Sequence, residues 1–162
     1  MPVSNFAGIL QQLVDNRVDF IVVGGVSAVL QGAPVTTFDL DVVHSREPGN
    51  VDRLLAALDS LDAHYRSRAE QRLRPNASHL SSQGHQLLMT RYGPLDLLGS
   101  IGESHDYEDL LKDATEVETG EGERVLVLTL ERLIAIKLET HNEKDLAMLP
   151  VLRRTLEEKN RG

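Results

Sequence analysis

The sequence predicts one domain of the α/β (α+β) class that spans residues 1–162. Apolar residues at helical spacing alternate along the chain with short β-rich runs, and no repeat, low-complexity tract or linker interrupts them. With 162 residues, 41% of them hydrophobic, the chain can bury one core, and a second independent domain is not expected.

The chain begins with a predicted amphipathic helix. Apolar residues over 6–14 recur at helical spacing after a cap at Ser4 or Asn5. A short β-rich run at 20–23 then predicts a buried strand, which Gly24 and Gly25 end in a tight turn.

The next predicted elements are a short helix over 26–30 and a strand over 37–43. On that strand, apolar side chains alternate with Asp39 and Asp41, so the two carboxylates share one face. A carboxylate pair on a hydrophobic strand is the first unusual feature of the sequence.

Helical spacing returns over 51–61, whereas residues 63–83 are polar and are expected to be irregular, with room for a short strand. The segments 86–90 and 95–98 then form a predicted hairpin around a Tyr-Gly-Pro turn. Its second strand carries one acidic residue, Asp96.

Helices dominate the predicted end of the chain. A short helix over 107–113 and a strand over 125–128 lead to an N-cap at Thr129 and a helix that ends near His141. The last predicted helix runs over 143–158 and contains Pro150, where a kink is expected.

Composition excludes several classes of function. The chain has no cysteine, which removes disulfides, zinc–thiolate sites and cysteine nucleophiles, and its six histidines have no metal-binding spacing. The net charge of −8 disfavours general electrostatic binding to nucleic acid. With no signal peptide and no apolar stretch long enough to cross a membrane, the chain is expected to be cytoplasmic.

Asp39 and Asp41 are candidate metal ligands. Two residues apart on a strand, their side chains leave the same face roughly 6–7 Å apart and can hold one ion or bridge two. Mg²⁺ prefers such oxygen ligands together with substrate phosphates, and Asp96 on an adjacent strand would complete a two-metal cluster. The alternative is that the pair only keeps an edge strand soluble.

Gly24, Gly25 and Ser27 form a candidate phosphate site. The two glycines follow a strand and open a helix, so the backbone can approach an anion closely, and the Ser27 hydroxyl can add a hydrogen bond. Taken alone, such a glycine pair is usually only a turn.

Several stretches together resemble the DNA polymerase β-like nucleotidyltransferase superfamily. Residues 22–27 (VVGGVS) and 37–43 (TFDLDVV) resemble its GG/S and DxD motifs, and residues 90–98 (TRYGPLDLL) resemble the strand that carries the third acid. Residues 130–138 (LERLIAIKL) and 144–146 (KDL) are similar to the C-terminal helices of minimal members related to abortive-infection (AbiEii-type) toxins. The resemblance covers most of the chain.

The resemblance implies the nucleotidyltransferase fold, a mixed β-sheet flanked by helices with further helices at the C-terminus. It also implies a nucleoside triphosphate as substrate and two Mg²⁺ ions, or Mn²⁺ in their place. The residues it assigns to nucleotide binding are Gly24, Gly25, Ser27, Lys137 and Lys144, and those it assigns to metal binding and catalysis are Asp39, Asp41 and Asp96. Of these, the two lysines have solvated surface charges as their alternative.

The resemblance also has departures. Many relatives carry an arginine where Val35 stands and another in the final motif, where residues 142–144 read Asn-Glu-Lys. Arg66, Arg68, Arg72 and Arg74 could contact phosphates of an acceptor, or could simply balance nearby acids.

The expected function is transfer of a nucleoside monophosphate to a hydroxyl of an RNA, a protein or a small molecule. The resemblance adds a toxin–antitoxin or phage-defence role, with an antitoxin as partner. A catalytically silent nucleotide-binding or interaction module on the same fold is the first alternative, and a two-metal phosphohydrolase is the second.

Overall fold

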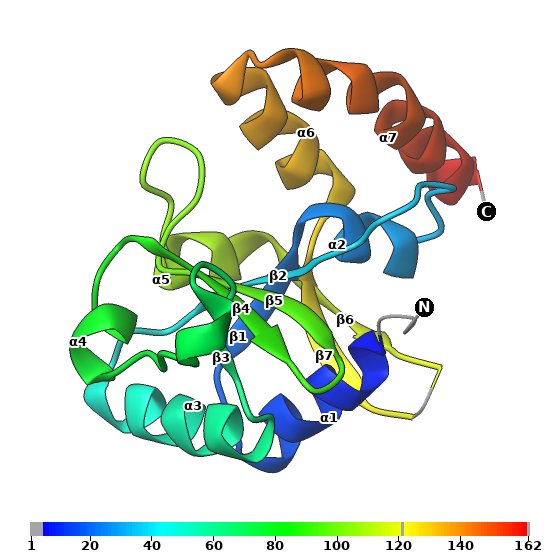
Figure 1. The fold of residues 1–162 in the computed structure, drawn as a ribbon. Helices are drawn as coiled ribbons and strands as arrows, with labels where there is room; N and C mark the ends of the chain where they lie inside the picture. Colours follow the sequence, from blue (N-terminus) through cyan, green and yellow to red (C-terminus); the bar gives the residue numbers. More distant parts are fainter. Residues whose placement is uncertain (1–4, 121, 162) are drawn as a thin grey trace.

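The computed structural model describes residues 5–120 and 122–161. It is a mixed seven-stranded sheet flanked by helices, with the strand order β3-β4-β5-β2-β1-β7-β6 (Figure 1). The predicted fold class is therefore confirmed. The strands are β1 (Phe20–Val23), β2 (Leu40–His44), β3 (His64–Tyr65), β4 (His85–Thr90), β5 (Gly93–Leu98), β6 (Ala114–Glu118) and β7 (Arg124–Leu128).

This sheet contains two parallel strand pairs among antiparallel ones. β2 is antiparallel to β1 and parallel to β5, while β1 is parallel to β7. The hairpin predicted from the Tyr-Gly-Pro turn is β4–β5, and β3 adds a short antiparallel edge to it.

Two layers of helices cover the sheet. α1 and α3 bury their apolar stripes on one face, and α2, α5, α6 and α7 contribute to the core on the other (Figure 1). The α-helices are α1 (Phe6–Asp15), α2 (Gly24–Leu30), α3 (Pro48–Ser60), α4 (Ala77–Leu80), α5 (Tyr107–Leu110), α6 (Leu130–Thr140) and α7 (Glu143–Arg161), and the 3₁₀ turns are η1 (Ala69–Gln71) and η2 (Leu111–Asp113).

Capping side chains set two of the helix starts. The Asn5 side chain accepts a hydrogen bond from the Gly8 amide, so Asn5 caps α1, whereas Ser4 lies outside the described residues. Thr129 caps α6 as predicted, by accepting from the amide of Arg132. α7 continues through Pro150.

The strand predicted over 37–43 starts too early. β2 begins only at Leu40, so Asp39 lies in the loop before the strand. Its two neighbours explain the difference: β1 ends at Val23, opposite Asp41, and β5 pairs with β2 only from Leu95, after Pro94, which has no amide to donate.

The sequence also gave no indication of β6, because its alternating polar side chains form a half-exposed edge strand.

Within the described residues, no helix combines the length and apolar character that a bilayer crossing demands.

Candidate active site

The glycine turn, which consists of Gly24 and Gly25, leads from β1 into α2 and brings Gly24 against the carboxylate of Asp41. Gly24 has φ +66°, a left-handed conformation, and a Cβ atom built there would lie 2.5 Å from Asp41 Oδ2. At Gly25, a Cβ atom would lie 2.8 Å from Thr37 Oγ1. The glycines therefore make room for two side chains of this protein, a role that the sequence analysis had not assigned to them.

Asp41 and Asp96 lie next to each other on parallel strands. They are register partners in the β2–β5 pair, so both side chains leave the same face of the sheet. Among the described residues, Asp41 Oδ1 is buried and accepts no hydrogen bond, whereas the buried Asp96 Oδ1 has an ion-pair contact with Arg66. The third acid, Asp39, lies in the loop directly before β2, two residues before Asp41.

Burial and neighbouring negative charge together shift the pKa of Asp41. Burial, followed by the proximity of Asp96 and then of Asp39, raises the pKa of Asp41 to about 7, against the opposing effect of Arg66. A buried carboxylate with carboxylate neighbours lacks positive charge, which a divalent cation would provide.

Arg66 supplies the one cation in contact with these acids in the described part of the chain. Its Nη2 lies 2.8 Å from Asp96 Oδ1, and its Nη1 donates to the Leu88 carbonyl at 2.9 Å. Arg66 therefore balances an acid, which is the second of the two interpretations of the arginine group. Arg72 and Arg74 also balance an acid, because both pair with Asp62.

A pocket of about 350 Å³ opens beside Asp41. One wall consists of the glycine turn, the loop 36–39 and Asp41. The other wall comes from the end of α6 and the start of α7, with Lys137, Asn142, Lys144, Asp145 and Met148. Both predicted lysines therefore line the same pocket as both predicted glycines.

Lys137 is held at this pocket by a carboxylate. Its Nζ donates to Asp145 Oδ1 at 3.1 Å, and Asp145 Oδ2 also accepts from Thr140 Oγ1 at 2.6 Å and Asn142 Nδ2 at 2.9 Å. Sequence reasoning missed Asp145 as a site residue, although it lies in the 144–146 motif. It also missed Thr37 and Phe38, which precede the acidic pair.

Ser27 does not reach the pocket. Its side chain is fully buried, and its hydroxyl donates to the Leu128 carbonyl at 2.9 Å, which also accepts from Gln31 Nε2 at 2.8 Å. In this conformation the hydroxyl ties α2 to β7 and is not available to a phosphate.

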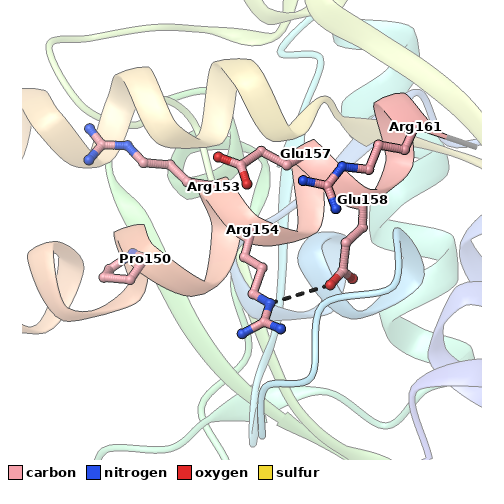
Figure 2. A pocket seen from close by; sticks show the side chains of 6 residues that line it. All are labelled: Pro150, Arg153, Arg154, Glu157, Glu158 and Arg161. Carbon is pink, nitrogen blue, oxygen red and sulfur yellow. Dashed lines mark hydrogen bonds and ion pairs between the residues drawn. The ribbon is translucent and has the colours of Figure 1, made fainter.

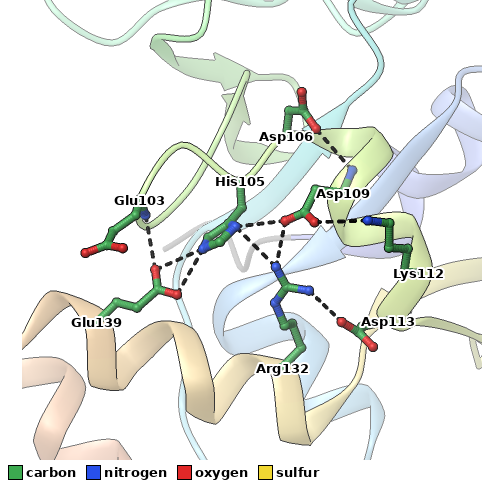
Figure 3. A network of polar contacts seen from close by, with 8 residues as sticks. All are labelled: Glu103, His105, Asp106, Asp109, Lys112, Asp113, Arg132 and Glu139. Carbon is green, nitrogen blue, oxygen red and sulfur yellow. Dashed lines mark hydrogen bonds and ion pairs between the residues drawn. The ribbon is translucent and has the colours of Figure 1, made fainter.

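A polar network joins α6 to residues 103–113 (Figure 3). His105 lies between Asp109, at 2.8 Å, and Glu139, at 2.9 Å, and Arg132 Nη2 donates to Asp109 at 2.7 Å. The hydrogen bond with Glu139 is the main reason that the pKa of His105 is raised. Because Arg132 and Glu139 flank Lys137 on α6, the network positions the helix that carries this lysine.

The residues at the pocket fit a divalent cation that is shared with a substrate. Across residues 5–120 and 122–161, no three acidic or histidine side chains converge into a ready-made metal cage. Mg²⁺ commonly takes only one or two protein carboxylates and completes its shell with phosphates and water. The unpartnered Asp41 Oδ1 and the neighbouring carboxylate of Asp96 are suitable for that arrangement.

A second hollow, of about 460 Å³, runs along α7 (Figure 2). All its lining residues come from this one helix, where arginines and glutamates alternate and Arg154 pairs with Glu158 at 3.3 Å. Such neutralised charges on a solvated helix give it no catalytic character.

Comparisons with known proteins identify the fold. The sequence matches no protein-family model and no curated protein. Among solved structures, a proposed nucleotidyltransferase of Thermotoga maritima superposes with a TM-score of 0.59 at 21% identity, over 94% of this chain and 91% of that one.

Two antibiotic-modifying enzymes have the same fold. The lincosamide antibiotic adenylyltransferase LnuA, solved with lincomycin, has a TM-score of 0.62 at 15% identity, over 91% of this chain and 94% of its own. ANT(2'')-Ia, solved with adenylyl-2''-tobramycin, has a TM-score of 0.56 at 14% identity, over 96% and 90%. At these identities the likeness establishes the fold.

Proposed function

We propose that this chain, which has the nucleotidyltransferase fold, is a divalent-metal-dependent enzyme that transfers a nucleoside monophosphate from a nucleoside triphosphate to a hydroxyl. One observation carries the proposal. Asp41 and Asp96 lie side by side on parallel strands, with Asp41 Oδ1 buried and unpartnered, next to a pocket that combines the glycine turn with Lys137 and Lys144.

Asp39, Asp41 and Asp96 are the proposed metal ligands, for two Mg²⁺ ions or for Mn²⁺. When bound, such ions neutralise the triphosphate and activate the attacking oxygen. The glycine turn lets the backbone approach the phosphates, whose charge Lys137 and Lys144 offset.

The proposed reaction is a displacement at the α-phosphorus. The acceptor oxygen forms a bond to this phosphorus while the bond to the bridging oxygen breaks, and pyrophosphate leaves with the electron pair. The proton of the acceptor hydroxyl passes to a carboxylate oxygen of Asp96.

The acceptor is an RNA, a protein side chain or a small molecule. LnuA was solved with lincomycin and ANT(2'')-Ia with an adenylylated tobramycin, so we would test small molecules first in an acceptor screen. The resemblance to abortive-infection proteins adds a narrower proposal, a toxin–antitoxin or defence role with a cognate antitoxin. Growth arrest on expression, relieved by a neighbouring gene product, would support it.

Calorimetric titration with α,β-methylene nucleoside triphosphates, with and without Mg²⁺, tests the proposal. We expect Mg²⁺-dependent binding that disappears in the Asp39→Asn/Asp41→Asn variant. The matched control is Asp52→Asn/Glu157→Gln, which removes two exposed carboxylates outside the pocket and should bind like the wild type. A folded wild-type protein that binds no nucleotide would rule the enzyme out.

Products separate the proposal from its two alternatives. A silent module, which the absence of arginine at Val35 and in residues 142–144 favours, would bind nucleotide but release nothing from it in any acceptor screen. A phosphohydrolase would release inorganic phosphate or a cleaved ester, whereas the transferase releases pyrophosphate and labels its acceptor.

A further inference from the structure

Phe38 is the most exposed large hydrophobic side chain among the described residues. It leaves 75% of its surface accessible, whereas Phe20 is buried and Phe6 packs against the core. Covering the apolar surface of a phenylalanine stabilises a protein by about 1.5–3 kcal/mol, and the exposed ring of Phe38 leaves this stabilisation available to a ligand.

The exposed ring belongs to the pocket and lies in an anchored loop. Phe38 lines the pocket directly before Asp39. The neighbouring Thr37 hydroxyl donates to the Asp39 carbonyl at 3.2 Å. Thr37 also packs closely over Gly25, because a Cβ atom built at Gly25 would lie 2.9 Å from the Cβ atom of Thr37. The backbone around Phe38 is therefore fixed while its ring remains uncovered.

The pocket has an apolar part and a charged part. Phe38, from the loop before β2, and Met148, from α7, are the large apolar side chains in its lining. The charged side chains of the lining are Lys137, Lys144, Asp145 and the proposed metal ligands Asp39 and Asp41. A ligand that matches this division has an uncharged planar group joined to an anionic group, as a nucleotide has.

The sheet order places Asp96 on the opposite side of Asp41 from Gly24. Gly24 follows β1 and Asp41 lies on β2, whereas Asp96 lies one strand farther on, on β5, and is not part of the pocket lining. If Asp96 takes the proton of the acceptor, the acceptor approaches over β5 and the pocket on the β1 side receives the nucleotide. Phe38 is on the nucleotide side.

From this arrangement we infer that Phe38 is the stacking platform for the nucleobase of the bound nucleoside triphosphate. The inference rests on the proposed function and adds a residue that recognises the base. Every base has an aromatic face, so stacking on Phe38 contributes affinity for all four nucleotides. The pocket volume of about 350 Å³ is within the usual range for a small-ligand site.

A single tryptophan can report this contact, because the natural chain has none. In Phe38→Trp, titration with Mg²⁺ and adenosine α,β-methylene triphosphate should quench the fluorescence, whereas inorganic tripolyphosphate, which has no base, should not. In Phe38→Ala, nucleotide binding should weaken roughly fivefold or more, with binding of tripolyphosphate unchanged. Phe38→Tyr should retain wild-type affinity, and Leu111→Ala, which trims a 44%-exposed side chain outside the pocket, serves as the control.

The outcomes separate the inference from the function on which it rests. If the wild type binds nucleotide and Phe38→Ala binds it equally well, the base does not stack on Phe38 and the proposed function stands. If Phe38→Ala weakens the binding of tripolyphosphate as much as the binding of nucleotide, Phe38 only shapes the loop and the inference is again overturned. If the wild type binds no nucleotide, both fall together.

Discussion

Replacing Gly24 by alanine should damage stability and the site at once. The residue has φ +66°, where an L side chain costs about 1–2 kcal/mol, and for a chain of this length that lowers the melting temperature by about 2–8 °C. The new methyl group would also lie 2.5 Å from Asp41 Oδ2, so the carboxylate would have to retreat by about 0.9 Å to reach an ordinary contact of 3.4 Å.

A displacement of that size is large compared with the ±0.2 Å tolerance of metal coordination. We therefore expect Mg²⁺-dependent nucleotide affinity to fall at least about tenfold in Gly24→Ala, because Asp41 can no longer reach the ion. Calorimetry with an α,β-methylene nucleoside triphosphate measures this loss, and a thermal melt measures the change in stability.

Gly32→Ala is the control that separates the two effects. Gly32 also has a positive φ, of +101°, but a Cβ atom there would meet nothing within 4 Å. This variant should lose stability and keep its nucleotide affinity. Wild-type affinity in a folded Gly24→Ala protein would refute the reasoning that the turn holds Asp41 in place.

Asp41, Ser27 and His105 support three further predictions. Asp41→Asn should stabilise the metal-free protein by about 4 kcal/mol above pH 7, because the folded-state pKa of Asp41 is raised from 3.8 to about 7 and ionisation then penalises the folded state. Thermal melts in EDTA should show the gain growing from about pH 4 to pH 7, and a gain independent of pH would contradict it. Ser27→Ala should cost about 1 kcal/mol in urea unfolding and leave nucleotide affinity unchanged, because its hydroxyl donates to Leu128 and not into the pocket. His105→Gln should destabilise the protein most between the ordinary pKa values of Glu139 and His105, 4.5 and 6.5, and progressively less as pH rises through the raised pKa of His105. Equal losses in urea unfolding at pH 5.5 and pH 8.5 would disprove an ionic role for the network.

Local patterns were enough to predict most elements of this fold. The apolar stripes of α1 and α3, the hairpin β4–β5 and the Thr129 cap depend on residues within one turn or one hairpin of each other. The start of β2 could not be predicted in this way, because it depends on where two strands distant in sequence stop pairing.

The same distinction applies to the candidate site. The spacing of Asp39 and Asp41 identified a carboxylate pair, and the structure places Asp96 on the strand next to Asp41. The sequence could not show that Arg66 pairs with Asp96, or that the carbonyl of Leu128, 101 residues from Ser27, accepts a hydrogen bond from the Ser27 hydroxyl. Those contacts are created by the arrangement of the strands.

The walls of the pocket have consequences for how the chain holds together. One wall belongs to the sheet and α2, and the other to the junction of α6 and α7, which is joined to the sheet through residue 129. A substrate bound between the two walls would contact both of them, so it would restrain the motion of α6 and α7 relative to the sheet. Amide hydrogens near that junction should then exchange with solvent more slowly in the loaded protein than in the free one.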